Sequence, residues 1–359
     1  MNLDGSRVPR VAGTHDPRCG PSEAGTIEIA VVSDPTYIEP IGVMLHSILR
    51  WHDPGSLRIH WVHVRMDRQA LRAAEELCRA AALRVNLVRA DAHLAESGWP
   101  ADVNPTLLKV LLPEILADAG ERLLYLDGDL VVEGPLWPLW QIDLQAGALA
   151  GVRDSWVGAR DFWSTIPPSI EVLHDLWMRR NYINAGVVLF DMARCRSLDM
   201  SGKCTRWLMA NRRSYFFEQD ALNVAVADAI VLAPPAWNVF GGADTCTAEA
   251  QPPSAYSAAE ILAAYRNPMI VHFAGWRKPW GDAKHWPPLA RRYFRARRCS
   301  PWHRPMNVAQ HLHLAALELA HWARRRRQVR AASAIYYAGR AVLEVDERLT
   351  KLLAAKRAR

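Results

Sequence analysis

The first third of the chain alternates between short apolar runs and segments in which apolar residues recur every three or four positions. The runs are typical of buried strands, and the longer segments are typical of amphipathic helices. The predicted order is strand 26–33, helix 40–51, strand 57–64, helix 68–82, strand 84–88, helix 106–119 and a strand that begins at Arg122. This βαβα order predicts an α/β fold with a mostly parallel sheet and helices on both faces.

The same patterns continue with less regularity to about residue 300 and then change. Further strands are predicted at 147–152, 186–190 and 268–273, and helices at 197–211 and 219–227. After Trp302 two long helices are predicted, at about 307–328 and 331–357. We therefore expect three parts: an N-terminal lead (1–25), an α/β domain (26–290) and a helical extension (291–359).

Composition agrees with a soluble α/β domain that has a substantial core. Hydrophobic residues make up 50% of the 359 positions and charged residues 23%. No apolar stretch approaches the roughly 18 residues of a membrane-spanning helix. Residues 1–25 are polar and rich in Pro and Gly, without the apolar segment of a signal peptide, and we expect them to be a disordered lead.

The positive charge is concentrated at the C-terminal end. The whole chain carries +7, but residues 291–359 contain 17 Lys and Arg against 4 Asp and Glu, so they carry +13 and the remainder carries −6. The basic character therefore describes the extension and not the α/β domain. Six cysteines are scattered without a CxxC pair, which predicts reduced thiols and a cytoplasmic location.

Two carboxylates one residue apart follow the strand that begins at Arg122. Asp127 and Asp129 flank Gly128, which allows a sharp turn and the close approach of a ligand. Buried acids are costly unless a cation neutralises them, and oxygen ligands at the carboxyl edge of a sheet suit a divalent ion. The alternative is a pair of acids in a solvated turn.

The turn after the first strand excludes one way of binding a nucleotide. Residues 33–37 read Ser-Asp-Pro-Thr-Tyr and contain no Gly-rich phosphate loop. Backbone amides at a helix N-terminus are therefore not the main phosphate holder, and a metal on Asp127 and Asp129 would have to take that role. A nucleotidyltransferase, which would need a Gly-rich basic loop here, is disfavoured.

Six motifs in order resemble those of the family-8 glycosyltransferases, the retaining GT-A enzymes that include bacterial lipopolysaccharide galactosyl- and glucosyltransferases and glycogenin. The motifs lie at 34–37, 124–129, 182–190, 217–223, 237–238 and 270–280. The resemblance implies a GT-A, Rossmann-like fold. It also implies transfer of a hexose, galactose or glucose, from a UDP-sugar to a glycan or glycolipid acceptor of the lipopolysaccharide type.

The resemblance implies a metal site and an electrophilic lysine. His272 would join Asp127 and Asp129 as ligands of Mn²⁺ or Mg²⁺ bridging the donor diphosphate. Lys278 would neutralise charge on the departing UDP. Without the other motifs, His272 would be taken for a core histidine and Lys278 for a surface lysine.

The resemblance also implies a set of donor-binding residues. They are Asp34, Tyr37, Lys109, Asp127, Gly128, Asn184, Ala185, Gly186, Gly275 and Lys278. Small residues at 185 and 186 would let the backbone approach a sugar, or would only mark a tightly packed strand start. Lys109 would lie beside the donor, or on a solvated helix face.

Catalytic roles beside the sugar are implied for Asp154, Glu218, Gln219 and Asp220, together with Lys278. The acids at 218 and 220 would also suit a helix N-terminus. Retention by double displacement needs a carboxylate under the anomeric carbon. The alternative is a front-face route, in which the acceptor attacks from the leaving-group side, and the resemblance favours this route.

The sequence departs from the family pattern at two places. Glu218 replaces the first Asp of the "DQD" segment, and Trp276-Arg277 replace the more usual residues before Lys278, on the acceptor side. Neither departure touches the metal ligands. These intact ligands argue against the remaining alternative, a non-catalytic sugar-nucleotide-binding or scaffold protein of the same fold.

The extension lies outside the resemblance. Its two helices each have an apolar side, and arginines cluster at 291–298 and 324–327. Aromatic residues beside arginines suit an anionic membrane surface, so peripheral contact at the inner face of the membrane is one hypothesis. A helical cap packed on the α/β domain is the other. Arginine clusters also bind nucleic-acid phosphates, but no nucleic-acid partner is expected.

Overall fold

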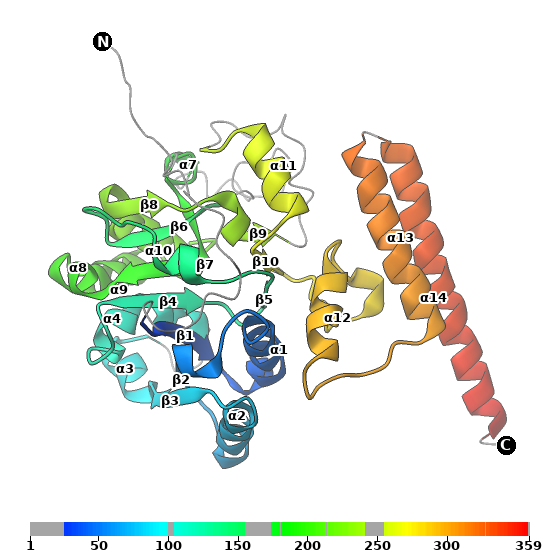
Figure 1. The fold of residues 1–359 in the computed structure, drawn as a ribbon, viewed down its shortest axis with the longest axis horizontal. Helices are drawn as coiled ribbons and strands as arrows, with labels where there is room; N and C mark the ends of the chain where they lie inside the picture. The colour runs from blue at the N-terminus through cyan, green and yellow to red at the C-terminus, as the bar shows by residue number, and fades with distance from the viewer. Residues whose placement is uncertain are drawn as a thin grey trace, which may run out of the picture.

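The computed structural model describes residues 25–99, 104–154, 174–179, 181–212, 214–240, 255–326 and 328–357. The predicted N-terminal lead, apart from Gly25, lies outside these residues. Figure 1 shows a twisted sheet covered by helices, with a pair of long helices standing beside it.

The main sheet has the strand order β3-β2-β1-β4-β7-β6-β8. Its strands are β1 (Ile27–Ser33), β2 (Leu57–His63), β3 (Arg84–Arg89), β4 (Arg122–Leu126), β6 (Leu149–Arg153), β7 (Ile183–Asp191) and β8 (Ile230–Leu232). All pairs are parallel except the two made by β7, which runs antiparallel to β4 and β6. The prediction of a mostly parallel sheet is confirmed, with one reversed strand in its centre.

A second, three-stranded sheet has the order β5-β10-β9. It consists of β5 (Leu130–Val132), β10 (Ile270–His272) and β9 (Val239–Phe240). The predicted strand that begins at Arg122 is β4, and the turn at Asp127–Asp129 then leads into β5, which belongs to the other sheet. Strand β10 pairs antiparallel with β5, and this pairing places His272 opposite Leu130.

Helices cover both faces of the main sheet, as predicted (Figure 1). The N-terminal half contains α1 (Ile38–Ile48), α2 (Arg68–Ala80), α3 (Asp91–Glu96), α4 (Leu112–Ile115) and α5 (Trp137–Trp140). The following part contains α7 (His174–Trp177), α8 (Met192–Ser197), α9 (Met200–Ala210), α10 (Glu218–Ala225) and α11 (Ala258–Arg266). Two large apolar clusters result. One includes Ile41 and Met44 of α1, and the other includes Leu208 of α9 and Leu222 of α10.

The predicted helix at 106–119 is wrong in type and length. A 3₁₀ helix (Pro105–Leu111) comes first, and α4 has only four residues. Pro113 explains the break, because it has no N–H to bond the carbonyl of Lys109 and its ring clashes with that turn. The tighter 3₁₀ segment buries Leu107, Leu108 and Lys109 together.

The C-terminal part contains α12 (Ala290–Arg298), α13 (Val308–Arg325) and α14 (Val329–Arg357). Tyr293 and Ala296 of α12 pack into a cluster with Val43 of α1 and Val271 of β10. The start of the range 291–359 is thus continuous with the α/β domain. Among the described residues, no helix is both long enough and apolar enough to cross a membrane.

The two long helices form a hairpin that packs on the segment before α12. Leu314 and Leu317 of α13 join a buried cluster with Trp286 and Ala290. Lys284 also forms an ion pair with Glu347 of α14, at 2.8 Å. These contacts agree with a helical cap, and they leave other apolar side chains of the hairpin exposed.

Candidate active site

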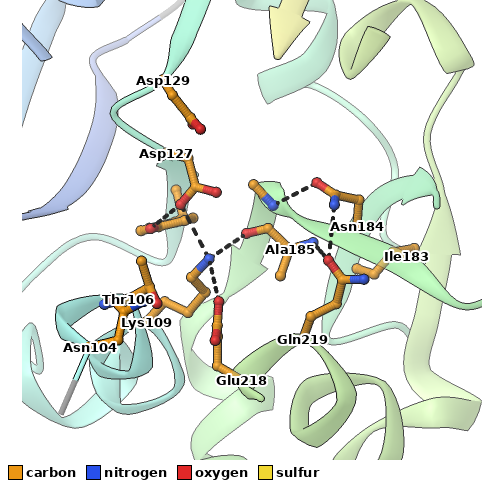
Figure 2. Close-up of polar contacts among 12 residues, drawn as sticks. Asn104, Thr106, Lys109, Asp127, Asp129, Ile183, Asn184, Ala185, Glu218 and Gln219 are labelled. Carbon is orange, nitrogen blue, oxygen red and sulfur yellow. Dashed lines mark hydrogen bonds and ion pairs between the residues drawn. The ribbon is translucent and has the colours of Figure 1, made fainter. Parts of the chain in front are cut away.

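The acid pair lies where β4 leaves the main sheet. The N–H of Asp127 donates to the carbonyl of Gly186 on β7 at 2.9 Å, so the turn begins at a fixed point. The chain then turns through Gly128 and enters β5 at Leu130. Figure 2 shows both carboxylates projecting from this turn to the same side, as the sequence predicted.

His272 completes a compact set of three possible metal ligands. Its Nε2 lies 3.2 Å from Asp129 Oδ1 and 3.7 Å from Asp127 Oδ2. One ligand atom from each residue lies within 4.8 Å of the other two. Carboxylate oxygens with one imidazole suit Mn²⁺ or Mg²⁺, so these residues fit the predicted divalent ion.

Gly186 is needed for this cluster to exist. A Cβ built on Gly186 would lie 2.2 Å from His272 Cε1 and 2.8 Å from Asp127 Oδ2, both far inside van der Waals contact. The sequence analysis predicted that the small residue at this position would let the backbone approach a sugar. The structure adds that the absent side chain leaves room for two metal ligands.

Lys278 reaches the acid pair from the loop after β10. Gly275 has φ +82°, a left-handed conformation that favours glycine and turns this loop back. The Lys278 ammonium donates to the Asp129 carboxylate and to the carbonyl of Phe273 at 2.8 Å. Burial would raise the pKa of Asp129, but Lys278 and His272 outweigh it and hold that pKa below its ordinary value. The site therefore places a cation directly beside the three candidate metal ligands.

Lys109 does not lie on a solvated helix face. It is 1% exposed, and its Nζ lies 3.2 Å from Asp127 Oδ1, 3.3 Å from Glu218 Oε1 and 3.1 Å from the carbonyl of Ala185 (Figure 2). Desolvation lowers the pKa of Lys109, but the two carboxylates outweigh it and the pKa is raised. Its contacts make Lys109 the cation that holds Asp127 and Glu218 in place.

Gln219 connects the residues predicted to lie beside the sugar. Its Oε1 accepts from Asn184 Nδ2 at 2.9 Å and from the N–H of Ala185 at 3.0 Å (Figure 2). Its Nε2 donates to Asp154 Oδ2 at 2.9 Å, and Asn184 Nδ2 donates to the same oxygen at 3.1 Å. The structure thus brings Asp154, Asn184 and Gln219 into one buried polar group.

Asp220 is connected to that group through Tyr182, because Gln219 Nε2 donates to Tyr182 Oη at 3.1 Å and the same hydroxyl donates to Asp220. Its carboxylate is fully buried and accepts from Trp177 Nε1 at 2.8 Å, Tyr182 Oη at 2.6 Å, Ser214 Oγ at 2.5 Å and the N–H of Phe216 at 3.1 Å. Four donors occupy both oxygens. These contacts do not support the predicted catalytic role of Asp220.

The predicted nucleotide loop lies against the acid pair through Tyr37. Burial and the negative charge of Asp129 raise the pKa of Tyr37, and together they outweigh the opposing effect of the Lys278 ammonium. The space beside Gly128 is filled by Tyr37 and Ile41, whose side-chain carbons would lie 2.9 and 2.8 Å from an added Cβ. Gly128 therefore accommodates these side chains, where the sequence predicted a ligand.

Asp34, in contrast, caps the 3₁₀ turn that carries Tyr37. Its carboxylate accepts from the N–H of Thr36 at 2.9 Å.

Two polar contacts of the site were not predicted. Tyr125 on β4 donates its hydroxyl to Asp127 Oδ1 at 2.5 Å. Asn238 lies between His272 and Asn184, with its side chain in hydrogen-bond distance of both. Both residues lie inside family motifs, Tyr125 in the segment 124–129 and Asn238 in the Trp237-Asn238 motif, but neither was assigned to the site.

Comparison with known proteins decides the family. The model of glycosyl transferase family 8 matches residues 28–284, which include all the residues of the site. The chain belongs to glycosyl transferase family 8. It is therefore a glycosyltransferase, and its sheet order and structural neighbours show the GT-A fold.

The relatives of this family-8 protein are distant but cover most of it. The lipopolysaccharide glucosyltransferase WaaO of Escherichia coli K12 is 21% identical over 286 residues, 77% of this chain and 79% of the relative. The galactosyltransferase LgtC, solved with donor and acceptor sugar analogs, superposes with a TM-score of 0.59 at 22% identity, and the match covers 77% of this chain and 96% of LgtC. The bifunctional glycosyltransferase WbbM superposes with a TM-score of 0.63 at 20% identity, covering 79% of this chain and 51% of WbbM, so this chain spans about half of that protein.

Proposed function

We propose that this glycosyltransferase moves a hexose, galactose or glucose, from a UDP-sugar to a glycan or glycolipid acceptor with retention of configuration, using Mn²⁺ or Mg²⁺. The observation that carries the proposal is the convergence of Asp127, Asp129 and His272 with Lys278 against Asp129. The relatives named as lipopolysaccharide glucosyltransferase and lipopolysaccharide 1,3-galactosyltransferase support the choice of donor and acceptor class.

The residues of the site divide the work of donor cleavage. A bound divalent ion would offset the charge of the leaving diphosphate, and Asp127, Asp129 and His272 would hold it. Lys278 is a preorganised ammonium in a part-buried position, where it stabilises developing negative charge more strongly than in water. Asp154, Asn184 and Gln219 offer a rigid polar edge to the sugar hydroxyls.

The contacts of the acidic residues favour the front-face route. A double displacement needs a free carboxylate close to the anomeric carbon. Glu218 is paired with Lys109 at 3.3 Å, and Asp220 accepts four hydrogen bonds. Asp154 Oδ2 accepts hydrogen bonds from Gln219 and Asn184. In the front-face route the bond from the anomeric carbon to the UDP oxygen breaks, and the acceptor oxygen bonds to the same face. The acceptor proton passes to the diphosphate oxygen.

The test is UDP release from purified protein with a panel of UDP-sugars, with Mn²⁺ and then with EDTA. Metal-dependent hydrolysis of UDP-galactose or UDP-glucose is expected, and it would identify the hexose. If no donor releases UDP, donor binding is measured by calorimetry. If the protein neither releases UDP nor binds a donor, the proposal is refuted, and the alternative of a non-catalytic protein of the same fold remains.

We further propose that the helical extension contacts an anionic membrane surface. A groove of about 720 Å³ lies between α13 and the segment from α11 to α12. Its basic wall contains Arg266, Arg291, Arg292 and Arg295, and its apolar wall includes Leu319 and Trp322, which are 50% and 42% exposed. Arginines beside exposed apolar residues suit phosphate headgroups and acyl chains.

The free thiols support a cytoplasmic location, which would make this surface the inner face of the membrane. Cys78, Cys195 and Cys204 are buried and unpaired.

The membrane contact is tested by sedimentation with vesicles that contain anionic phospholipid. The full chain is compared with the variant Leu319→Glu, which places a charge on the apolar wall without touching the buried face of α13. Loss of binding in Leu319→Glu, with UDP release retained, is expected. Equal sedimentation of both proteins, or none by the full chain, would reject the membrane contact.

A further inference from the structure

Asn238 occupies a buried position between the metal-ligand cluster and the sugar-side group. It lies directly before β9 and is 6% exposed. Its Oδ1 is 3.0 Å from His272 Nδ1, and its Nδ2 is 2.8 Å from Asn184 Oδ1. A side chain that bridges two functional groups in this way can transmit the orientation of one to the other.

The hydrogen bonds around Asn184 determine which way its amide faces. The backbone N–H of Gly186 can only donate, and it lies 3.0 Å from Asn184 Oδ1, so this atom is the carbonyl oxygen. The other end of the amide lies against Gln219 Oε1 (Figure 2) and against Asp154 Oδ2, both of which accept. Three independent partners therefore agree on one orientation of Asn184.

The orientation of Asn184 in turn fixes Asn238 and His272. Because Asn184 presents a carbonyl oxygen, Asn238 must offer its NH₂ group to it, and its own carbonyl then faces His272. A carbonyl accepts only, so His272 Nδ1 carries a proton. The opposite nitrogen, Nε2, faces the two carboxylates at 3.2 and 3.7 Å.

We propose that Asn238 is a positioning residue for the metal site: it holds His272 as the Nδ1–H tautomer, so that Nε2 is the atom that binds the divalent ion. The inference rests on the metal site of the proposed function. Histidines that bind metals commonly donate their second N–H to a carbonyl or carboxylate, which fixes the ring and raises its basicity. Here that acceptor is itself oriented by the residues beside the sugar.

The first test measures Mn²⁺ binding by calorimetry in the full chain, without donor. Asn238→Ala is expected to weaken Mn²⁺ binding by about 10- to 100-fold, the usual cost of losing such a partner. The matched control is Asn223→Ala on α10. Asn223 is 2% exposed and bonds both backbone groups of Ile183, but has no contact with His272. Its variant should lose thermal stability and keep wild-type Mn²⁺ affinity.

Two results would overturn the inference: unchanged Mn²⁺ affinity in Asn238→Ala, or an equal loss in both variants, which would indicate a general structural effect. If Asn238→Ala does not fold, the second test decides. It records ¹⁵N-histidine spectra of the metal-free wild-type protein at alkaline pH, with the His272→Asn variant to assign the signal. A protonated Nδ1 is expected, and a protonated Nε2 with bare Nδ1 contradicts the inference.

Failure of the proposed function gives a different pattern. If the wild-type protein binds Mn²⁺ and shows the Nδ1–H tautomer but cleaves no UDP-sugar, the role of Asn238 stands and the transferase proposal fails. If activity is present but the tautomer is reversed, the transferase stands and the role of Asn238 fails.

Discussion

Gly186→Ala separates the geometry of the metal site from its chemistry, because the change adds one methyl group and removes no ligand. The added Cβ would lie 2.2 Å from His272 Cε1 and 2.8 Å from Asp127 Oδ2. Ordinary contacts of this kind begin near 3.4 Å, so the ring must move by about 1 Å. Gly186 has no positive φ, so the alanine backbone is unstrained and the effect is steric.

The expected magnitudes follow from this displacement. Overpacking a buried site costs roughly 1–3 kcal/mol of the free energy of unfolding. A displacement of about 1 Å at a reacting centre costs on the order of 10²-fold in rate. We therefore expect Gly186→Ala to fold, to bind Mn²⁺ more weakly, and to release UDP at least ~10²-fold more slowly.

The assay compares Mn²⁺ calorimetry, UDP release and urea unfolding in three proteins. The control is Gly42→Ala, whose Cβ would also lie 2.2 Å from a ring atom, here of Trp302, and whose nearest neighbours belong to Trp302 and Leu77 and not to the ligand cluster. Gly42→Ala should lose stability and keep Mn²⁺ affinity. Wild-type Mn²⁺ affinity and turnover in Gly186→Ala would show that the ligand cluster is not the functional centre.

Three further predictions follow from the charges of the chain. Asp127→Asn or Asp129→Asn should lower the rate of UDP release by at least ~10²-fold, because metal charge stabilises the leaving group. Wild-type turnover in either variant would reject the metal assignment. Lys109→Met leaves Asp127 and Glu218 without their shared cation, so urea unfolding should show a loss of about 3–5 kcal/mol, and no loss would contradict the buried pairing. Burial lowers the pKa of His52 from 6.5 to about 4, so the fold is most stable above pH 6.5, where the ring is neutral, and the free energy of unfolding falls by roughly 3 kcal/mol as the pH is lowered to 4. In His52→Gln, urea unfolding should show a weaker dependence of this free energy on pH. An unchanged pH dependence would assign it to other groups.

The sequence predicted the parts of the fold in which periodicity extends over many residues. Strand β1 is a seven-residue segment that is apolar except for Glu28 and Ser33, and α2 has a clear apolar stripe, so each was predictable by itself. Strand β10 lies inside the strand predicted at 268–273, but its pairing with β5 and β9 into a second sheet was not predictable, because these strands have only two or three residues each and such lengths carry no period. The 3₁₀ segment before α4 also differed, because a single proline overrode an apolar pattern that favours a helix.

Motifs predicted which residues lie in the site, but not what each one contacts. The cluster of Asp127, Asp129 and His272 was predicted and is present. Lys109 was assigned to donor binding and Asp220 to catalysis, whereas their contacts in the structure are with buried protein groups. The identity of a lysine or an aspartate in the sequence does not show whether its side chain contacts a ligand or another side chain, so only the three-dimensional structure distinguishes these two kinds of contact.

The pairing of β10 with β5 also has a consequence for how the chain folds. His272 follows Asp129 by about 140 residues, and it reaches the acids only when Leu130 and His272 are in register. Non-local pairings of this kind form late, because the entropy of closing a long loop must be overcome first. The ion would therefore bind only to molecules that have completed this step, and by mass action it would stabilise them over partly folded chains. During synthesis on the ribosome, no part of the chain that ends before β10 has a complete ion site.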